Sequence, residues 1–107
     1  MARVVAISAD LLLGSKVEAM LTAAGHEVTS TSSLPEQLED VDLLVADLDA
    51  EDPQALTEAG IPVLGYYSHV NVETKRAAEE AGIDLAVPRS RMARELPNLV
   101  NELLNRG

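Results

Sequence analysis

The sequence predicts a single α/β domain over residues 1–107, with a five-stranded parallel sheet and helices on both of its faces. Short apolar runs alternate with helical patterns along the whole chain, which is typical of parallel strands joined by right-handed crossovers. The length suffices for one hydrophobic core and leaves no room for a second. Val, Leu, Ile and Ala supply most of the 47% apolar content, so we expect an aliphatic core.

Five segments are predicted as strands. Four are continuous apolar runs edged by polar or turn residues, as in strands that are buried on both faces. These runs cover residues 3–7, 41–46, 61–66 and 83–87. Residues 26–31 instead alternate Val28 with polar neighbours, which places this segment at an edge of the sheet.

Helical patterns separate these strands. Between Leu13 and Ala24, apolar residues recur at spacings of three and four, and Gly25 follows as a C-cap. A second helix is predicted from Asn71, its N-cap, through Glu80.

The last helix is predicted from the apolar pattern between Leu96 and Leu104, with Pro97 in its first turn, where a proline is tolerated. Two short helices are also predicted, over residues 34–39 and 53–59.

Composition excludes several classes of function. The sequence contains no cysteine, which removes disulfides, thiolate metal sites and cysteine nucleophiles. The formal net charge is -10 and Lys and Arg number only 8, which disfavours nucleic-acid binding. The first residues lack the long apolar stretch of a signal peptide, and no run approaches the roughly 20 apolar residues of a membrane span. We therefore expect a cytoplasmic protein with no nucleic-acid or membrane partner.

Polar residues gather in four predicted loops that follow strands. In parallel sheets of this kind, ligands bind beyond the carboxyl ends of the strands, where the strand order reverses. We therefore expect the functional site in these loops. Their residues are Ser8, Ala9 and Asp10; Asp47, Leu48 and Asp49; Tyr67, Ser68 and His69; and Pro88, Arg89, Ser90 and Arg91.

Five strand and helix units, with an aspartate ending the third strand in the segment VDLLVADLD, form a recognisable layout. This layout resembles the response-regulator receiver (CheY-like) family across essentially the whole chain. The resemblance implies a flavodoxin-like, doubly wound sheet with strand order 2-1-3-4-5 and a role in two-component signalling. It also implies that Asp47 accepts a phosphoryl group. The segment after Asp47 is shorter than in the family, which implies a helix of only a turn or two.

The phosphoryl contacts that the resemblance implies are altered in this chain. The family binds the phosphoryl oxygens with a hydroxyl residue and a Lys. Their positions fall on Tyr67, with Ser68 beside it, and on Arg89. Arginine keeps the positive charge and adds a fork that can hold a carboxylate or phosphate, but it changes reach and geometry.

The metal-binding position differs more strongly. The family carries two adjacent acidic residues that bind Mg²⁺, and their positions fall on Ser8 and Ala9, with Asp10 one residue later. Phosphoryl transfer to a carboxylate depends on such a cation to offset charge. A local bulge that brought Asp10 in would make Asp10, Asp47 and Asp49 the Mg²⁺ ligands. We expect inefficient phosphorylation.

The candidate residues also have plainer interpretations. Asp47 belongs to a residue type that is common in turns at strand ends. Arg89 could be a surface charge, or could form a salt bridge to Asp47 or Asp10 across the cleft. His69 directly follows Ser68, so their side chains point to opposite faces and do not form a nucleophile and base. We expect Ser8 and His69 as cleft residues without an assigned role.

Three functions remain open on the sequence alone. The first is a stand-alone pseudo-receiver, not an enzyme, that binds a protein partner or itself through its last helix and the loop before it. That region holds the basic cluster Arg89, Arg91 and Arg94. The second is a single-domain response regulator that is phosphorylated on Asp47. The third is a small-ligand binder on the same scaffold, although the first loop lacks the Gly-x-Gly-x-x-Gly and P-loop lysine patterns.

Overall fold

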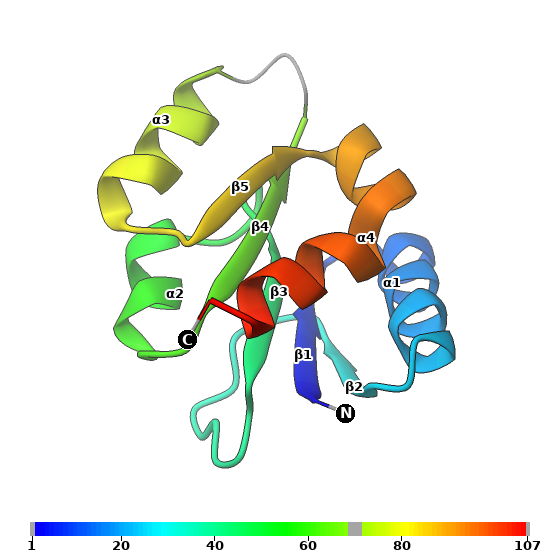
Figure 1. Cartoon of the computed structure of the whole chain (residues 1–107). Helices are drawn as coiled ribbons and strands as arrows, with labels where there is room; N and C mark the ends of the chain where they lie inside the picture. Colours follow the sequence, from blue (N-terminus) through cyan, green and yellow to red (C-terminus); the bar gives the residue numbers. More distant parts are fainter. Residues whose placement is uncertain (1, 69–71, 107) are drawn as a thin grey trace.

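Strands and helices alternate as the sequence predicts, except between the second and third strands. The computed structural model describes residues 2–68 and 72–106. Figure 1 shows these elements with their labels. They are β1 (Arg3–Ile7), α1 (Leu11–Ala23), β2 (Glu27–Thr31), β3 (Leu43–Asp47), α2 (Pro53–Glu58), β4 (Val63–Tyr67), α3 (Val72–Ala81), β5 (Leu85–Pro88) and α4 (Arg89–Leu104).

The five strands form one parallel sheet in the order β2-β1-β3-β4-β5, which confirms the predicted fold class and strand order. β2 lies at the edge, and its Val28 packs against the core while the residues on either side of it are exposed. β3, β4 and β5 each begin two residues later and end one residue later than predicted.

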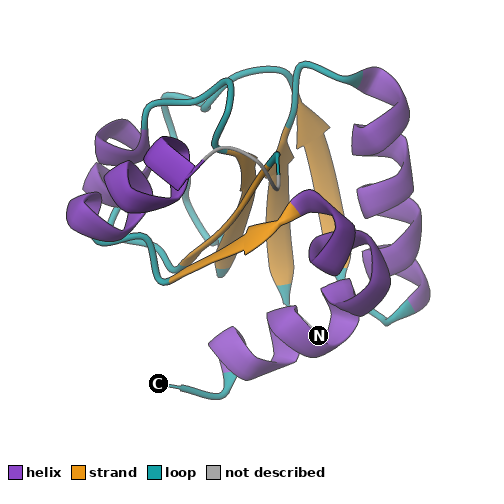
Figure 2. Cartoon of the chain, turned by 90° about the horizontal axis from the view of Figure 1, so that it is seen from above, coloured by secondary structure: helices purple, strands orange, loops and turns teal. Residues whose placement is uncertain are grey.

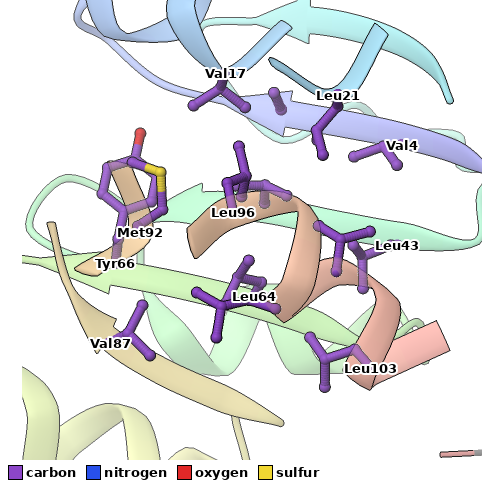
Figure 3. Packing of buried hydrophobic residues seen from close by; sticks show 14 residues of the cluster. Val4, Val17, Leu21, Leu43, Leu64, Tyr66, Val87, Met92, Leu96 and Leu103 are labelled. Atoms are coloured by element: carbon purple, nitrogen blue, oxygen red, sulfur yellow. The ribbon is translucent and has the colours of Figure 1, made fainter. Parts of the chain in front are cut away.

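The helices cover both faces of the sheet. α1 and α4 lie on one face, and α2 and α3 lie on the other (Figures 1 and 2). Because β3 is covered on both sides, all of its residues are buried. On the first face, Leu96 of α4 lies between Leu21 of α1 and Leu64 of β4 (Figure 3).

The predicted helix over residues 34–39 is wrong. The chain between β2 and β3 has no helical residue, and Asp40 has a left-handed φ of 62°. Leu34, Leu38 and Val41 pack from this loop against the core on the second face. Because the first turn of so short a helix is costly to nucleate, a loop places these apolar side chains in the core instead.

The last helix starts earlier than its apolar pattern indicates, and the placement of Pro97 in its first turn is wrong. α4 begins at Arg89, so Pro97 lies inside the helix, which bends midway along its length (Figure 2). A proline there removes one backbone hydrogen bond. The burial of Met92 and Leu96 before it, and of Leu99, Val100 and Leu103 after it, outweighs that loss. Arg89 and Arg91 therefore stand in the first turn of α4 rather than in a loop.

Of the remaining helices, α1 begins two residues before its predicted apolar pattern, and its C-cap is Ala24, with the predicted cap Gly25 following at a φ of 94°. α2 has six residues, which confirms the short helix expected after Asp47. Asn71, the predicted N-cap of the next helix, lies outside the described residues. Within residues 2–68 and 72–106, no helix is long and apolar enough to cross a membrane.

Gly65 in β4 makes room for the loop that leaves β3. A Cβ atom at this position would lie 2.5–2.7 Å from side-chain atoms of Leu48. Leu48 is buried, and its N–H donates a hydrogen bond of 2.8 Å to the Tyr66 carbonyl. Leu48 therefore needs the space above Gly65, and its position determines where Asp47 and Asp49 on either side of it lie.

Gly65→Ala should lower the free energy of unfolding by about 1–3 kcal/mol, because the added methyl group overpacks a buried position. Gly14→Ala within α1 is the matched control. Its Cβ would meet the Ser8 Cβ at 3.9 Å, an ordinary contact, so it should raise stability by about 0.5 kcal/mol. Urea unfolding followed by circular dichroism measures both variants. Unchanged stability of Gly65→Ala would contradict this packing argument.

Candidate functional site

Side chains from four parts of the chain meet at the carboxyl edge of the sheet, where the strand order reverses between β1 and β3. The charges of Asp10 and Arg89 affect the pKa values of Asp47 and Tyr66, and Arg89 forms an ion pair with Asp10. The residues are Ser8 after β1, Asp10 at the N-cap of α1, Asp47 at the end of β3, Tyr66 in β4 and Arg89 at the start of α4.

Asp47 is the buried acidic residue of this site. It is only 8% exposed, and its Oδ1 accepts a hydrogen bond of 2.9 Å from the Asp49 N–H. Burial raises the pKa of the Asp47 carboxyl, and the negative charges of Asp49 and Asp10 raise it as well. The Asp49 N–H and the positive charge of Arg89 act in the opposite direction without cancelling the rise. The site thus holds an acidic group whose ionised form is disfavoured.

Asp10 connects α1 to α4. Its Oδ1 accepts hydrogen bonds from the N–H groups of Leu12 and Leu13, at 3.0 and 3.2 Å, and so caps α1. Its Oδ2 lies 3.8 Å from Nη2 of Arg89, with both side chains about half exposed. The predicted salt bridge of Arg89 across the cleft is therefore present, and its partner is Asp10.

Ser8 stands where the resemblance places an acidic residue, and its hydroxyl is engaged within the chain. It accepts a hydrogen bond of 3.1 Å from the Asp10 N–H and donates one of 3.2 Å to the Asp10 carbonyl. Tyr66 is 1% exposed, and the Ser8 side chain lowers the pKa of its hydroxyl against the larger effect of burial. Burial raises the pKa of the Tyr66 hydroxyl, so the phenol stays neutral beside Asp47.

The remaining predicted residues are placed differently. Oδ2 of Asp49 accepts a hydrogen bond of 2.8 Å from the Ser68 N–H, which ties the loop after β3 to the end of β4. Tyr67 is buried in the core on the second face of the sheet. His69 lies outside the described residues. The roles of Tyr67 and Ser68 as phosphoryl contacts stay predictions.

The three aspartates predicted as Mg²⁺ ligands already form contacts within the chain. In the described part of the chain, no three acidic, histidine or cysteine side chains are grouped so as to hold a metal ion. Asp10, Asp47 and Asp49, the predicted ligand set, each accept a backbone hydrogen bond with one carboxylate oxygen. Asp10 additionally has Arg89 beside its second oxygen. The role of Asp10, Asp47 and Asp49 as Mg²⁺ ligands stays a prediction.

Two features of the site were missed from the sequence. The sequence pattern places Tyr66 only in a strand, whereas the register of the sheet sets Tyr66 directly beside Asp47. The capping role of Asp10 was also missed. The signal for it was an aspartate immediately before an apolar helix, a usual N-terminal pattern.

Comparison with known proteins supports the fold. No protein-family model and no curated protein matches the sequence. Among solved structures, a response regulator receiver domain protein from Clostridium thermocellum aligns with a TM-score of 0.84 and 16% identity, covering 99% of this chain and 96% of that one.

Two further solved structures give the same result. The receiver domain of TorR, the response regulator of the TMAO respiratory system, has a TM-score of 0.84 and 22% identity, and the alignment covers 99% and 98% of the two chains. An orphan response regulator of H. pylori has a TM-score of 0.79 and 22% identity, with 97% of each chain covered. The chain therefore has the fold of response-regulator receiver domains.

Asp47→Asn should raise the free energy of unfolding at neutral pH by about 1 kcal/mol, because it removes a buried charge and keeps an oxygen for the Asp49 N–H. The pKa of Asp47 is raised in the folded state, so the parent loses stability as pH rises from the ordinary pKa of 3.8 through the folded pKa. The advantage of Asp47→Asn should appear over that window and then stay constant. Thermal unfolding from pH 3 to 8 measures it.

Glu58→Gln is the control for this experiment, because it removes one negative charge from an exposed position of α2. It should not reproduce the pH-dependent gain. A lower stability of Asp47→Asn at neutral pH, or a gain that does not vary with pH, would show that Asp47 is not disfavoured in its ionised form.

Proposed function

We propose that this chain is a signalling module that works by binding a protein and that is not phosphorylated efficiently on Asp47. The proposal rests on the hydrogen bonds and the ion pair that the site carboxylates already form within the chain. Asp10 caps α1 and lies beside Arg89, and Asp47 is buried with Asp49 as its hydrogen-bond donor. Without a divalent cation, the negative charge that develops during phosphoryl transfer has no adequate counter-charge.

A phosphorylated Asp47 is the competing function, and it is directly testable. We expect no added phosphoryl mass after incubation of the protein with Mg²⁺ and a small phosphodonor such as acetyl phosphate, measured by intact mass spectrometry. Asp47→Asn is the control for labelling elsewhere. A phosphoryl group that appears on the parent and is absent from Asp47→Asn would replace the proposed function with that of a phosphorylated response regulator.

The binding surface that we propose is the N-terminal half of α4 with the end of β5 before it. Three arginines, Arg89, Arg91 and Arg94, lie there on a chain whose net charge is -10. Arg91 and Arg94 both contact Glu95, at 3.3 and 3.7 Å, and Arg89 lies 3.8 Å from Asp10, so three positive charges face two negative ones and this basic patch keeps a small excess of positive charge. A basic patch on an acidic protein favours an acidic partner, and a second copy of the chain is itself acidic.

A cytoplasmic location also stays a prediction.

Reversing charges on this patch should weaken self-association. Arg91→Glu with Arg94→Glu should raise the dimer dissociation constant by roughly tenfold or more, measured by sedimentation velocity over a concentration series at low salt. Lys75→Glu with Arg76→Glu is the matched control, because it reverses two exposed charges on α3, on the other face of the sheet. A chain that stays monomeric throughout would contradict self-association and leave a different acidic protein as the partner.

A further inference from the structure

The exposed edge of β2 is a second surface on which this chain can meet another molecule. We propose that two copies of the chain join their sheets at this edge, with β2 of one copy running antiparallel to β2 of the other. The contact involves neither the carboxylate site nor the arginines of α4, so it goes beyond the proposed function and can be tested independently of it.

β2 is hydrogen-bonded to another strand on one side only. It stands at one end of the strand order β2-β1-β3-β4-β5 and pairs with β1 in parallel. The Glu27 N–H donates a hydrogen bond of 2.9 Å to the Ala2 carbonyl, and the Thr31 carbonyl accepts one of 2.9 Å from the Ser8 N–H. The odd-numbered residues of β2 therefore direct their backbone groups toward β1.

Val28 and Ser30 direct their backbone groups away from β1, because successive residues of a strand alternate in direction. Their N–H and C=O groups have no hydrogen-bond partner within residues 2–68 and 72–106. Both residues following Val28, Thr29 and Ser30, are exposed. A strand edge with free donors and acceptors is a template for pairing with another strand.

The edge also lacks the features with which natural sheets usually prevent such pairing, namely lysine, proline or a bulge. None of the five residues of β2 is lysine or proline, its register with β1 runs without a bulge, and residues 28–35 carry no charge. The opposite edge of the sheet differs. There β5 ends in Pro88, which has no N–H, and α4 begins directly after it.

A second copy of the chain matches this edge when Thr29 lies opposite Thr29 of the second copy. In that antiparallel register, which a two-fold axis generates, Val28 of each copy exchanges both hydrogen bonds with Ser30 of the other, so every outward group is used. Glu27 then lies opposite Thr31, and the two Glu27 carboxylates stand at opposite ends of the pair. Facing threonines are a favourable cross-strand pair.

The charges beside the edge allow two copies to approach, although each has a net charge of -10. Glu27 forms an ion pair of 3.0 Å with Arg3, and Glu18 of α1 accepts a hydrogen bond of 2.9 Å from the Ser30 hydroxyl. The contact itself gathers little charge, while the two chains repel one another as wholes. Because salt screens this repulsion, pairing through β2 should tighten as salt rises, whereas a contact through the arginines of α4 should weaken.

The pairing should be weak. A strand of five residues buries much less than the roughly 1,200 Å² of a stable complex. We therefore expect a dissociation constant on the order of 0.1–1 mM.

Amide hydrogen exchange of ¹⁵N-labelled protein tests the pairing directly. It would be measured at low and at millimolar protein concentration in about 0.5 M NaCl, where repulsion between copies is screened. The N–H groups of Val28 and Ser30 should exchange about twofold more slowly at the higher concentration, because pairing protects them from water. The N–H of Thr29 faces β1 and should not change. Equal exchange of Val28 and Ser30 at both concentrations would overturn the proposal.

A charge swap at Thr29 tests the register. Thr29→Glu and Thr29→Lys each set two like charges opposite one another, so each variant alone should show a dissociation constant about fivefold higher than the parent. An equimolar mixture of the two variants sets opposite charges face to face and should associate at least as tightly as the parent. Sedimentation velocity over a concentration series in the same salt measures all of these.

Gln54→Glu and Gln54→Lys are the matched controls, because they make the same charge changes at an exposed position of α2. Both should associate like the parent. Association that Thr29→Glu leaves unchanged, a mixture no tighter than either variant alone, or a chain that stays monomeric would each overturn the proposal. Loss of association in Arg91→Glu with Arg94→Glu, but not in Thr29→Glu, would overturn the β2 contact and support the basic patch. The reverse result would support the β2 contact and refute the patch.

Discussion

The central constraint on this structure is that a carboxylate ends a strand that is buried on both faces. β3 lies in the middle of the sheet with helices on either side, so the side chain of Asp47 has little access to water. A buried carboxylate without partners either loses its charge or destabilises the fold. The surroundings of Asp47 follow from this constraint, because the Asp49 N–H donates a hydrogen bond and Arg89 brings positive charge.

These partners connect parts of the chain that lie far apart in sequence. Arg89 at the start of α4 reaches Asp10 at the start of α1, and Asp49 accepts a hydrogen bond from Ser68. The ends of β1, β3, β4 and β5 are thereby linked around the point where the strand order reverses. Receiver domains share this scaffold, but fold alone does not determine function. What the site can do therefore depends on how these carboxylates are engaged rather than on the fold.

Sequence periodicity predicted most of the elements because burial on both faces of a sheet requires continuous apolar runs. It failed where one local pattern is compatible with two different structures. The spacing of Leu34, Leu38 and Val41 suits a short helix, yet the same side chains reach the core from a loop. Pro97 suits a helix start, yet burial on both sides of it carries α4 through the proline. In both places, tertiary packing outweighed local preference.

The sequence by itself determined the α/β class, the five strands, the edge position of β2 and the loops in which a site would lie. Apolar runs and their polar boundaries record burial directly, which is why these features were accessible. Only the tertiary structure decided that Asp10 faces Arg89 and that Tyr66 lies beside Asp47 in the site. Those contacts join residues from different crossovers and depend on distances between side chains, which no local pattern encodes.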